Sequence, residues 1–203
     1  TETELKLDHR TLGLLYLQWI LFGGNFVLYW LAPLPLWIHV TIGIIAIHLS
    51  FTIWHEAAHG TISTRRWLND AAGVLGMFPY MTPYFMQRFV HLDHHKYLNE
   101  PDKDPNQIYA AGPFWQLPFR YVRAIAYAKK MLLTDHEAEA ANQDITILAG
   151  IGLIFIISIW QHFFVDLFWL WLLPLVIAKV IMDWYINFLP HTGLPPDRFL
   201  GTR

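Results

Sequence analysis

Long, mainly apolar runs dominate the pattern of hydrophobic and polar positions along the chain. Leu12 to Leu31 is twenty residues without a charge, and Leu34 to Trp54 is twenty-one more. Two later apolar runs cover Ile145 to Gln161 and Leu167 to Ile186. Each run is about long enough to cross a hydrocarbon core of about 30 Å, because an α-helix rises about 1.5 Å per residue. The pattern predicts an all-α integral membrane fold with four spans.

The connections between these runs predict how the spans pair. Pro33 and Pro35 mark a tight turn between the first two spans, and residues 162–166 link the last two. We therefore expect two transmembrane helical hairpins in a single membrane domain covering residues 1–203. The insert between them, residues 55–144, contains two apolar segments broken by prolines or basic residues, and such segments are typical of helices lying at a membrane interface. This insert is expected to form a cytosolic and interfacial helical cap.

Composition narrows the class of protein further. The chain is 55% hydrophobic and only 15% charged, so a bilayer is its expected solvent. A formal net charge of -2 does not indicate a nucleic-acid partner. The absence of cysteine excludes disulfides, thiolate-ligated haem and cysteine-ligated iron–sulfur clusters. Imidazole and carboxylate groups are the remaining strong metal ligands.

Basic residues indicate which side of the membrane each segment faces. The two short turns contain no Lys or Arg, whereas residues 55–144 contain nine. Cytosolic loops carry the excess of Lys and Arg in multi-span proteins. Both termini and the central insert are therefore expected to be cytosolic. Four of the basic residues form a candidate basic patch: Arg120, Arg123, Lys129 and Lys130.

Histidines gather in two tight clusters inside the insert and at its start. Five of the eleven histidines lie within residues 55–95. His55 and His59 are spaced i, i+4, while His91, His94 and His95 are spaced i, i+3, i+4. On a helix each set lies on one face, and neutral imidazole is the commonest protein ligand for a transition metal. This spacing predicts a metal site.

A third element lies at the end of the fourth span. Asn187 and His191 are again spaced i, i+4, and Asp183 lies one turn before Asn187. The predicted topology places His191 level with the end of the second span. Pro190 cannot donate a backbone hydrogen bond and should bend the helix there, which changes the direction of His191.

Three interpretations of these clusters remain open. The first is a non-haem di-iron centre. The second is an intramembrane zinc metalloprotease, because His55-Glu56-x-x-His59 matches the H-E-x-x-H pattern, with Glu56 as general base. A catalytic zinc needs only three protein ligands, so this interpretation leaves the histidines of residues 91–95 unexplained. The third is a non-catalytic membrane protein, which explains the clustering poorly.

These motifs resemble the histidine boxes of the membrane fatty acid desaturase superfamily. The resemblance covers nearly the whole chain, including the four spans. The motifs that carry it are His55-x-x-x-His59, His91-x-x-His94-His95 and Asn187-x-x-x-His191. The second box continues into Asn99-x-Pro101-x-x-Asp104-Pro105, and this run is most similar to the bacterial-type carotenoid ring hydroxylases. Glu56 stands where those hydroxylases more often have aspartate.

The resemblance implies oxygen activation at two iron ions and attack on an unactivated C–H bond of a lipophilic substrate from the bilayer. It favours hydroxylation of a carotenoid ring, with fatty acyl desaturation as the alternative. The implied iron ligands are His55, His59, His91, His94, His95 and His191. Asn187 would bind metal through water or orient a ligand, together with Asp183, Asp104 and Glu56.

The implied reaction consumes electrons, which this sequence has no means of supplying. It has no cysteine and no Gly-rich dinucleotide loop after a strand. A ferredoxin or small cytochrome is therefore the expected donor, with the basic patch as its candidate landing surface. His48 lies seven residues before His55 on the same helix face and is a candidate for lining a substrate path.

One feature of the superfamily is missing from this sequence. The superfamily has a further His-x-x-His-His box downstream, but the twelve residues after His191 contain no histidine. We expect the chain to be a fragment that ends before this box, and an inactive relative is the alternative.

Overall fold

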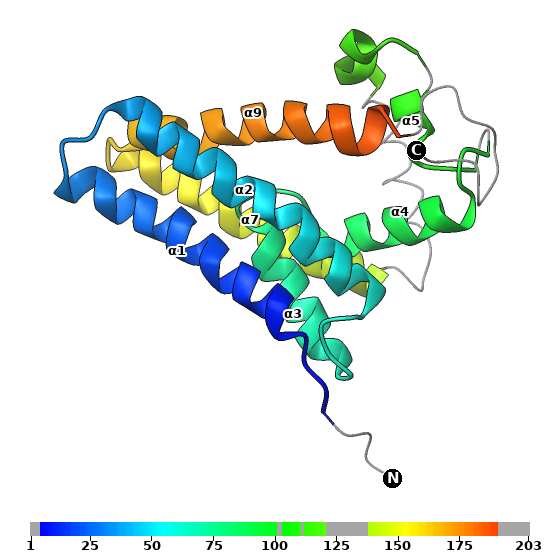
Figure 1. Ribbon diagram of the computed structural model, residues 1–203. Helices are drawn as coiled ribbons and strands as arrows, with labels where there is room; N and C mark the ends of the chain where they lie inside the picture. The colour runs from blue at the N-terminus through cyan, green and yellow to red at the C-terminus, as the bar shows by residue number, and fades with distance from the viewer. Residues whose placement is uncertain (1–4, 101–102, 111, 121–137, 191–203) are drawn as a thin grey trace. The chain divides into compact units, whose positions relative to one another are not determined.

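The computed structural model describes residues 5–100, 103–110, 112–120 and 138–190, and the secondary structure of these residues is helical apart from one isolated bridge (Figure 1). Among the described residues four helices are long and apolar enough to cross a membrane, which confirms the four predicted spans by length and composition. Their bounds are His9–Leu31, Leu36–His59, Ala141–Trp160 and Phe164–Phe188. The contacts divide the chain into two compact units, residues 1–84 with 145–179 and residues 85–144 with 180–203. The hairpin pairing and the cytosolic cap remain predictions.

Capping residues set the start of the first span and the end of the second. Helix α1 (His9–Leu31) starts after Asp8, whose carboxylate accepts the backbone N–H groups of Arg10 and Thr11. The hydrogen bond from the Thr11 hydroxyl lowers the pKa of Asp8. Helix α2 (Leu36–His59) follows the predicted proline turn and ends at Gly60, whose φ of 71° is the left-handed conformation that favours glycine.

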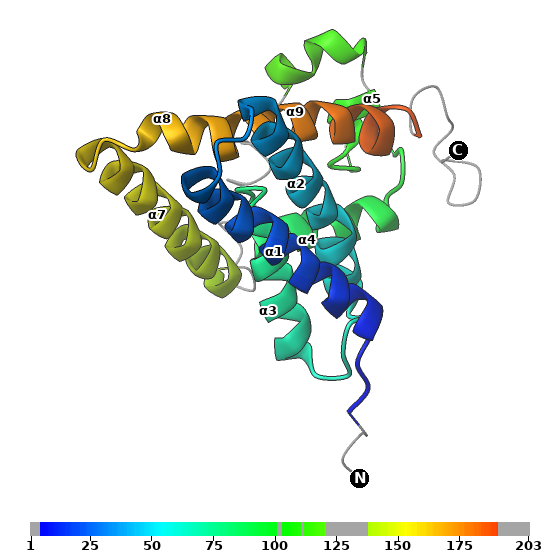
Figure 2. The same cartoon turned by 60° about the vertical axis from the view of Figure 1, so that its left-hand side comes forward.

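Buried polar side chains join the helices of the first unit. The Gln18 amide donates to the Ser50 hydroxyl at 2.7 Å and to the carbonyl of Gly76 at 3.0 Å. Asn25 and His39 exchange two hydrogen bonds of 2.9 Å between α1 and α2, which lie side by side (Figures 1 and 2). Polar groups inside a span face protein rather than lipid because an unsatisfied donor there is costly.

Helix α3 (Arg66–Met77) packs along α2. Gly76 lies against Ile53, and a Cβ at position 76 would come within 2.5 Å of the Ile53 side chain. The turn after α3 also reaches the apolar core of this unit, where the Trp171 indole donates to the Pro79 carbonyl at 2.7 Å. Small residues allow this close approach of two helices.

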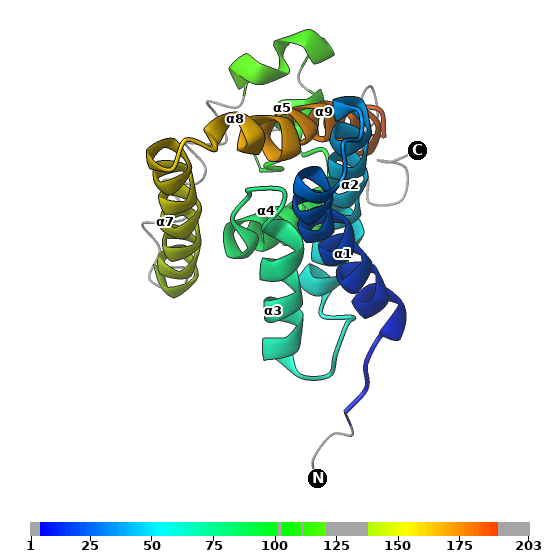
Figure 3. The same cartoon turned by 90° about the vertical axis from the view of Figure 1, so that its left-hand side faces the viewer.

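A short link joins the last two spans. Helix α7 (Ala138–Trp160) is followed by α8 (Phe164–Leu167), the π-helical η2 (Phe168–Leu172), α9 (Leu173–Met182) and the π-helical η3 (Asp183–Phe188) (Figure 3). Asp166 of α8 accepts a hydrogen bond of 2.9 Å from the Tyr29 hydroxyl of α1. Helix η3 ends just before Leu189 and Pro190. The bend expected at Pro190 stays a prediction, because the residues after it lie outside the described part of the chain.

The second unit contains α4 (Tyr84–Lys96), α5 (Gln107–Ala110) and the short 3-10 helix η1 (Phe114–Gln116). The Phe114 ring lies 5.4 Å from the Phe188 ring of η3. The first turn of α4 is held by Asp144, which accepts the backbone N–H groups of Phe85 and Met86. This unit therefore connects α4, which carries three of the histidines, with the start of the third span.

Candidate metal centre

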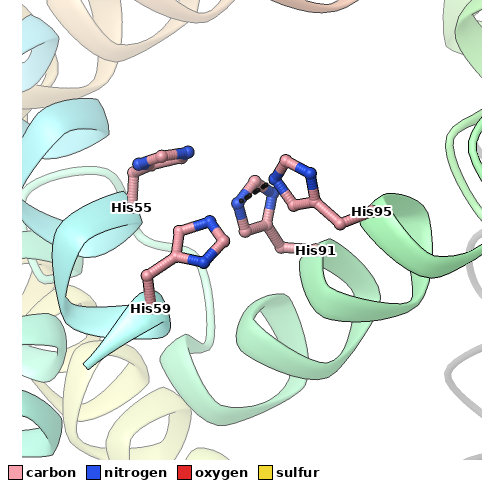
Figure 4. A group of neighbouring side chains, drawn as sticks. All are labelled: His55, His59, His91 and His95. Atoms are coloured by element: carbon pink, nitrogen blue, oxygen red, sulfur yellow. Dashed lines mark hydrogen bonds between the residues drawn. The ribbon is translucent and has the colours of Figure 1, made fainter. Parts of the chain in front are cut away.

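The first histidine pair lies at the end of α2. The His55 and His59 rings are 4.6 Å apart between centroids, and each offers a ligand nitrogen within 4.8 Å of the other (Figure 4). Their i, i+4 spacing places both on one face of the helix, as predicted. Because Gly60 ends the helix directly after His59, the pair lies at the terminus of the span.

Glu56 is held beside this pair by two side chains. One carboxylate oxygen lies 3.1 Å from His55 Nδ1, and the other accepts the Thr61 hydroxyl at 2.6 Å. Metal-bound imidazoles usually donate their second nitrogen to a carboxylate or carbonyl, and Glu56 is in position to accept it from His55. Thr61 was not among the predicted residues. The signal for it is the hydroxyl that follows the helix-ending glycine.

The second pair lies on α4. His91 Nε2 and His95 Nε2 are 3.1 Å apart, and their ring centroids are 4.4 Å apart (Figure 4). This separation is less than twice a zinc–imidazole bond of about 2.1 Å, so both nitrogens are close enough to ligate one transition-metal ion. His91 is buried and His95 is exposed. The donor set of this pair fits a divalent transition metal.

His94 differs from its neighbours because a buried carboxylate fixes its ring. His94 Nδ1 lies 2.8 Å from Asp104 Oδ1, and each residue is only 5% exposed. Asp104 also accepts the backbone N–H groups of Asn99 at 2.7 Å and Asn106 at 2.8 Å. With Nδ1–H donated to the carboxylate, Nε2 carries the lone pair that a metal would take. The role of Asp104 in orienting a metal ligand stays a prediction.

The third predicted element is described only in part. Asp183 is 3% exposed, and its carboxylate accepts the Asn187 amide at 3.2 Å on η3. His191 lies outside the described residues, so its predicted role as a ligand stays a prediction. π-helical turns are rare and are frequently found at functional sites.

Two other predicted residues have surroundings that bear on their roles. His48 is exposed on α2, and its place on a substrate path stays a prediction. The Arg120 guanidinium donates to the carbonyls of Tyr109, Gly112 and Pro113, so it organises the loop before η1. The other three residues of the basic patch, Arg123, Lys129 and Lys130, lie outside the described residues.

Four helices long enough to span a membrane, together with histidine pairs on two helices, define a histidine-rich integral membrane protein. Residues 28–203 match the fatty acid desaturase family, and the chain belongs to that family. This finding confirms the resemblance of the histidine boxes to the desaturase superfamily.

The individual relatives are also desaturases, and this chain aligns with about half or less of the length of each one. The chain is 39% identical to an sn-1 oleoyl-lipid 12-desaturase of Anabaena variabilis over 54 residues. These residues are 27% of this chain and 15% of that protein. Over 66 residues it is 32% identical to an omega-3 fatty acid desaturase of Caenorhabditis elegans, covering 32% and 16% of the two chains. A dihydrorhizobitoxine desaturase of Bradyrhizobium elkanii is 25% identical over 83% of this chain and 54% of its own length.

Proposed function

We propose that this chain provides the membrane core of an oxygen-dependent, non-haem di-iron enzyme that oxidises a C–H bond of a lipophilic substrate. The observation that carries the proposal is the pair of Nε2 atoms of His91 and His95, 3.1 Å apart on the histidine-bearing helix of a fatty acid desaturase family member. The resemblance of the boxes supports assigning six histidines to the irons: His55, His59, His91, His94, His95 and His191.

When bound, the two irons would supply the oxygen activation that no amino-acid side chain provides. The protein's own groups hold and orient the ligands. Asp104 fixes the tautomer and direction of His94, and Glu56 does the same for His55. Asp183 and Asn187 are proposed to orient a ligand or a metal-bound water at the end of the fourth span.

We place fatty acyl desaturation first among the reactions. Two of the relatives named above are an sn-1 oleoyl-lipid 12-desaturase and an omega-3 fatty acid desaturase, and the third is a dihydrorhizobitoxine desaturase. No carotenoid hydroxylase is among these three. Hydroxylation of a carotenoid ring is the second candidate. The sequence of the run after the second box supports it. In this run Asp104 contacts His94 and accepts the backbone N–H of Asn99.

The surroundings of the reaction are proposed on the same basis. A lipophilic substrate reaches the site from the bilayer, and a separate ferredoxin or cytochrome delivers the electrons. The excess of Lys and Arg in residues 55–144 supports a cytosolic location for the histidines and for both termini.

The test combines product analysis with metal analysis. The protein is expressed in a host that makes both unsaturated lipids and carotenoids, and fatty acid methyl esters and carotenoids are quantified. The matched variants are His59→Ala, His94→Ala and, as control, His9→Ala, which changes an exposed histidine at the start of α1. We expect a new double bond and about two irons per chain in the protein and the control, and loss of both in the other two variants.

Other outcomes separate the alternatives. A hydroxylated carotenoid without a new acyl double bond would replace the first reaction with the second. One zinc per chain, lost with His59 and unchanged by His94→Ala, would overturn the oxygenase proposal in favour of zinc hydrolysis. A protein with no iron and no product would overturn the catalytic proposal for this chain.

A further inference from the structure

Asp144 is a buried acidic residue at the start of the third span. It is 1% exposed and lies on α7, where it is the fourth residue of the apolar segment Ala141–Trp160. A carboxylate in such a place is costly unless its oxygens are satisfied, and an ionisable residue in a span is often functional. Its contacts therefore indicate what it does.

Both oxygens of Asp144 bind the first turn of α4. Oδ1 accepts the backbone N–H of Phe85 at 3.0 Å, and Oδ2 accepts that of Met86 at 2.6 Å. These are the second and third residues of the helix, whose N–H groups have no partner within it. A residue just before a helix usually satisfies them with its own side chain, but here that residue is Pro83, which has no side-chain acceptor. Asp144 fills this role from 58 residues away.

The capped helix is short and carries metal-ligand candidates. Helix α4 has 13 residues, and helices of this length are marginal without outside support. His91, His94 and His95 lie in its last two turns, about 9 Å or more along the axis from Phe85 at about 1.5 Å per residue. Fixing the first turn fixes the start and rotation of the helix and so the direction of these imidazoles. The negative carboxylate is also favourable at the positive end of the helix dipole.

We infer that Asp144 is a positioning residue for the metal centre, acting as an N-cap supplied by the third span to the histidine-bearing helix. It touches no candidate ligand in its described hydrogen bonds and acts through the backbone of α4. The link to metal rests on the proposed function, whereas the link to the order of α4 does not.

The test uses the full chain in detergent with two variants at this position. Asp144→Asn keeps one side-chain acceptor oxygen in place of two, whereas Asp144→Ala removes the cap. Co(II) alone is titrated and followed by its absorption bands. Hydrogen exchange is measured for peptides within residues 85–96.

We expect Asp144→Ala to bind Co(II) about tenfold more weakly, as for the loss of an outer partner of a metal ligand, and to exchange the amides of α4 faster. Asp144→Asn should lie between the unsubstituted protein and Asp144→Ala in both measurements, because one of the two backbone N–H groups keeps its acceptor and the other loses it. The matched control is Asp166→Ala, which removes another span aspartate, the acceptor of the Tyr29 hydroxyl. It should lower thermal stability and leave Co(II) affinity unchanged.

Two results would overturn the inference. Equal losses in Asp144→Asn and Asp144→Ala would show that the charge or direct ligation matters, not capping. Unchanged exchange of α4 in Asp144→Ala would show that the helix does not depend on this residue. If the unsubstituted protein binds no Co(II) or Fe(II), the proposed function fails, and the exchange data still decide the role of Asp144 in ordering α4.

Discussion

The two helices that carry histidine pairs are stabilised in different ways. Helix α2 is a 24-residue apolar span, and His55 and His59 lie at its end. There His55 contacts Glu56, which also accepts a hydrogen bond from Thr61. Helix α4 has only 13 residues and is held by side chains from outside it, Asp144 at its start and Asp104 near its end. One pair thus takes its position from a long membrane helix. The other depends on individual hydrogen bonds to carboxylates.

Removing a ligand from either helix should produce the largest effect. We expect His59→Ala and His95→Ala to lose nearly all bound iron, measured by elemental analysis of the purified protein, because each leaves its pair with a single imidazole. Neither change should alter the helical circular dichroism spectrum. A variant that retains full iron would remove that histidine from the proposed ligand set.

Asp104 tests the dependence of α4 on carboxylates. Asp104→Ala should weaken Co(II) binding by about 10- to 100-fold, the usual range for an outer partner of a ligating histidine. The buried Nδ1 of His94 and the amides of Asn99 and Asn106 would lose their acceptor together. Asp104→Asn should retain part of the affinity, since its amide oxygen still accepts. Equal affinity in all three proteins would contradict the role of Asp104.

Glu56 is expected to matter less for metal than Asp104, because it is only half-buried and lies at the end of a long helix. Glu56→Gln should change Co(II) affinity by less than about tenfold. It should also leave part of the desaturation activity, measured as the new double bond. Complete loss of the new double bond with metal fully bound would contradict this minor role and would show that Glu56 takes part in the reaction itself.

Substitution of Gly60, which ends α2, should have the smallest effect, a loss of protein stability. Gly60→Ala places a Cβ on a residue with a φ of 71° and should lower the free energy of unfolding by about 1–2 kcal/mol. Gly24→Ala is the matched control in α1, because a Cβ there has nothing within 4 Å. Denaturant titration in detergent should show no loss for the control. Equal losses would indicate that the left-handed turn is not what limits substitution at position 60.

Sequence patterns predicted the parts of the molecule that depend on local chemistry. Uninterrupted apolar length predicted the four spans, and i, i+4 spacing predicted that His55 and His59, and likewise His91 and His95, share a helix face. The tail of the second box indicated Asp104, which the structure joins to His94.

Contacts between distant segments could not be predicted in this way. Nothing in the local pattern pairs Asp144 with Phe85 and Met86, because the acceptor lies on another helix. The packing of α3 along α2 depends on Gly76 meeting Ile53, which depends on the tertiary path of the chain. Substrate choice between an acyl chain and a carotenoid ring depends on pocket shape, which single residues do not encode.

The hydrogen bond from Tyr29 to Asp166 has a consequence for biogenesis. Its two partners are 137 residues apart, so at ribosomal speeds of about 5–20 residues per second the acceptor emerges roughly 7 to 30 s after the donor. During that interval the phenol must be hydrated or sheltered by the insertion machinery. Tyr29 lies two residues before the end of the first span, so its bond to the fourth span can form only after insertion of the first span has begun and the fourth span has been made.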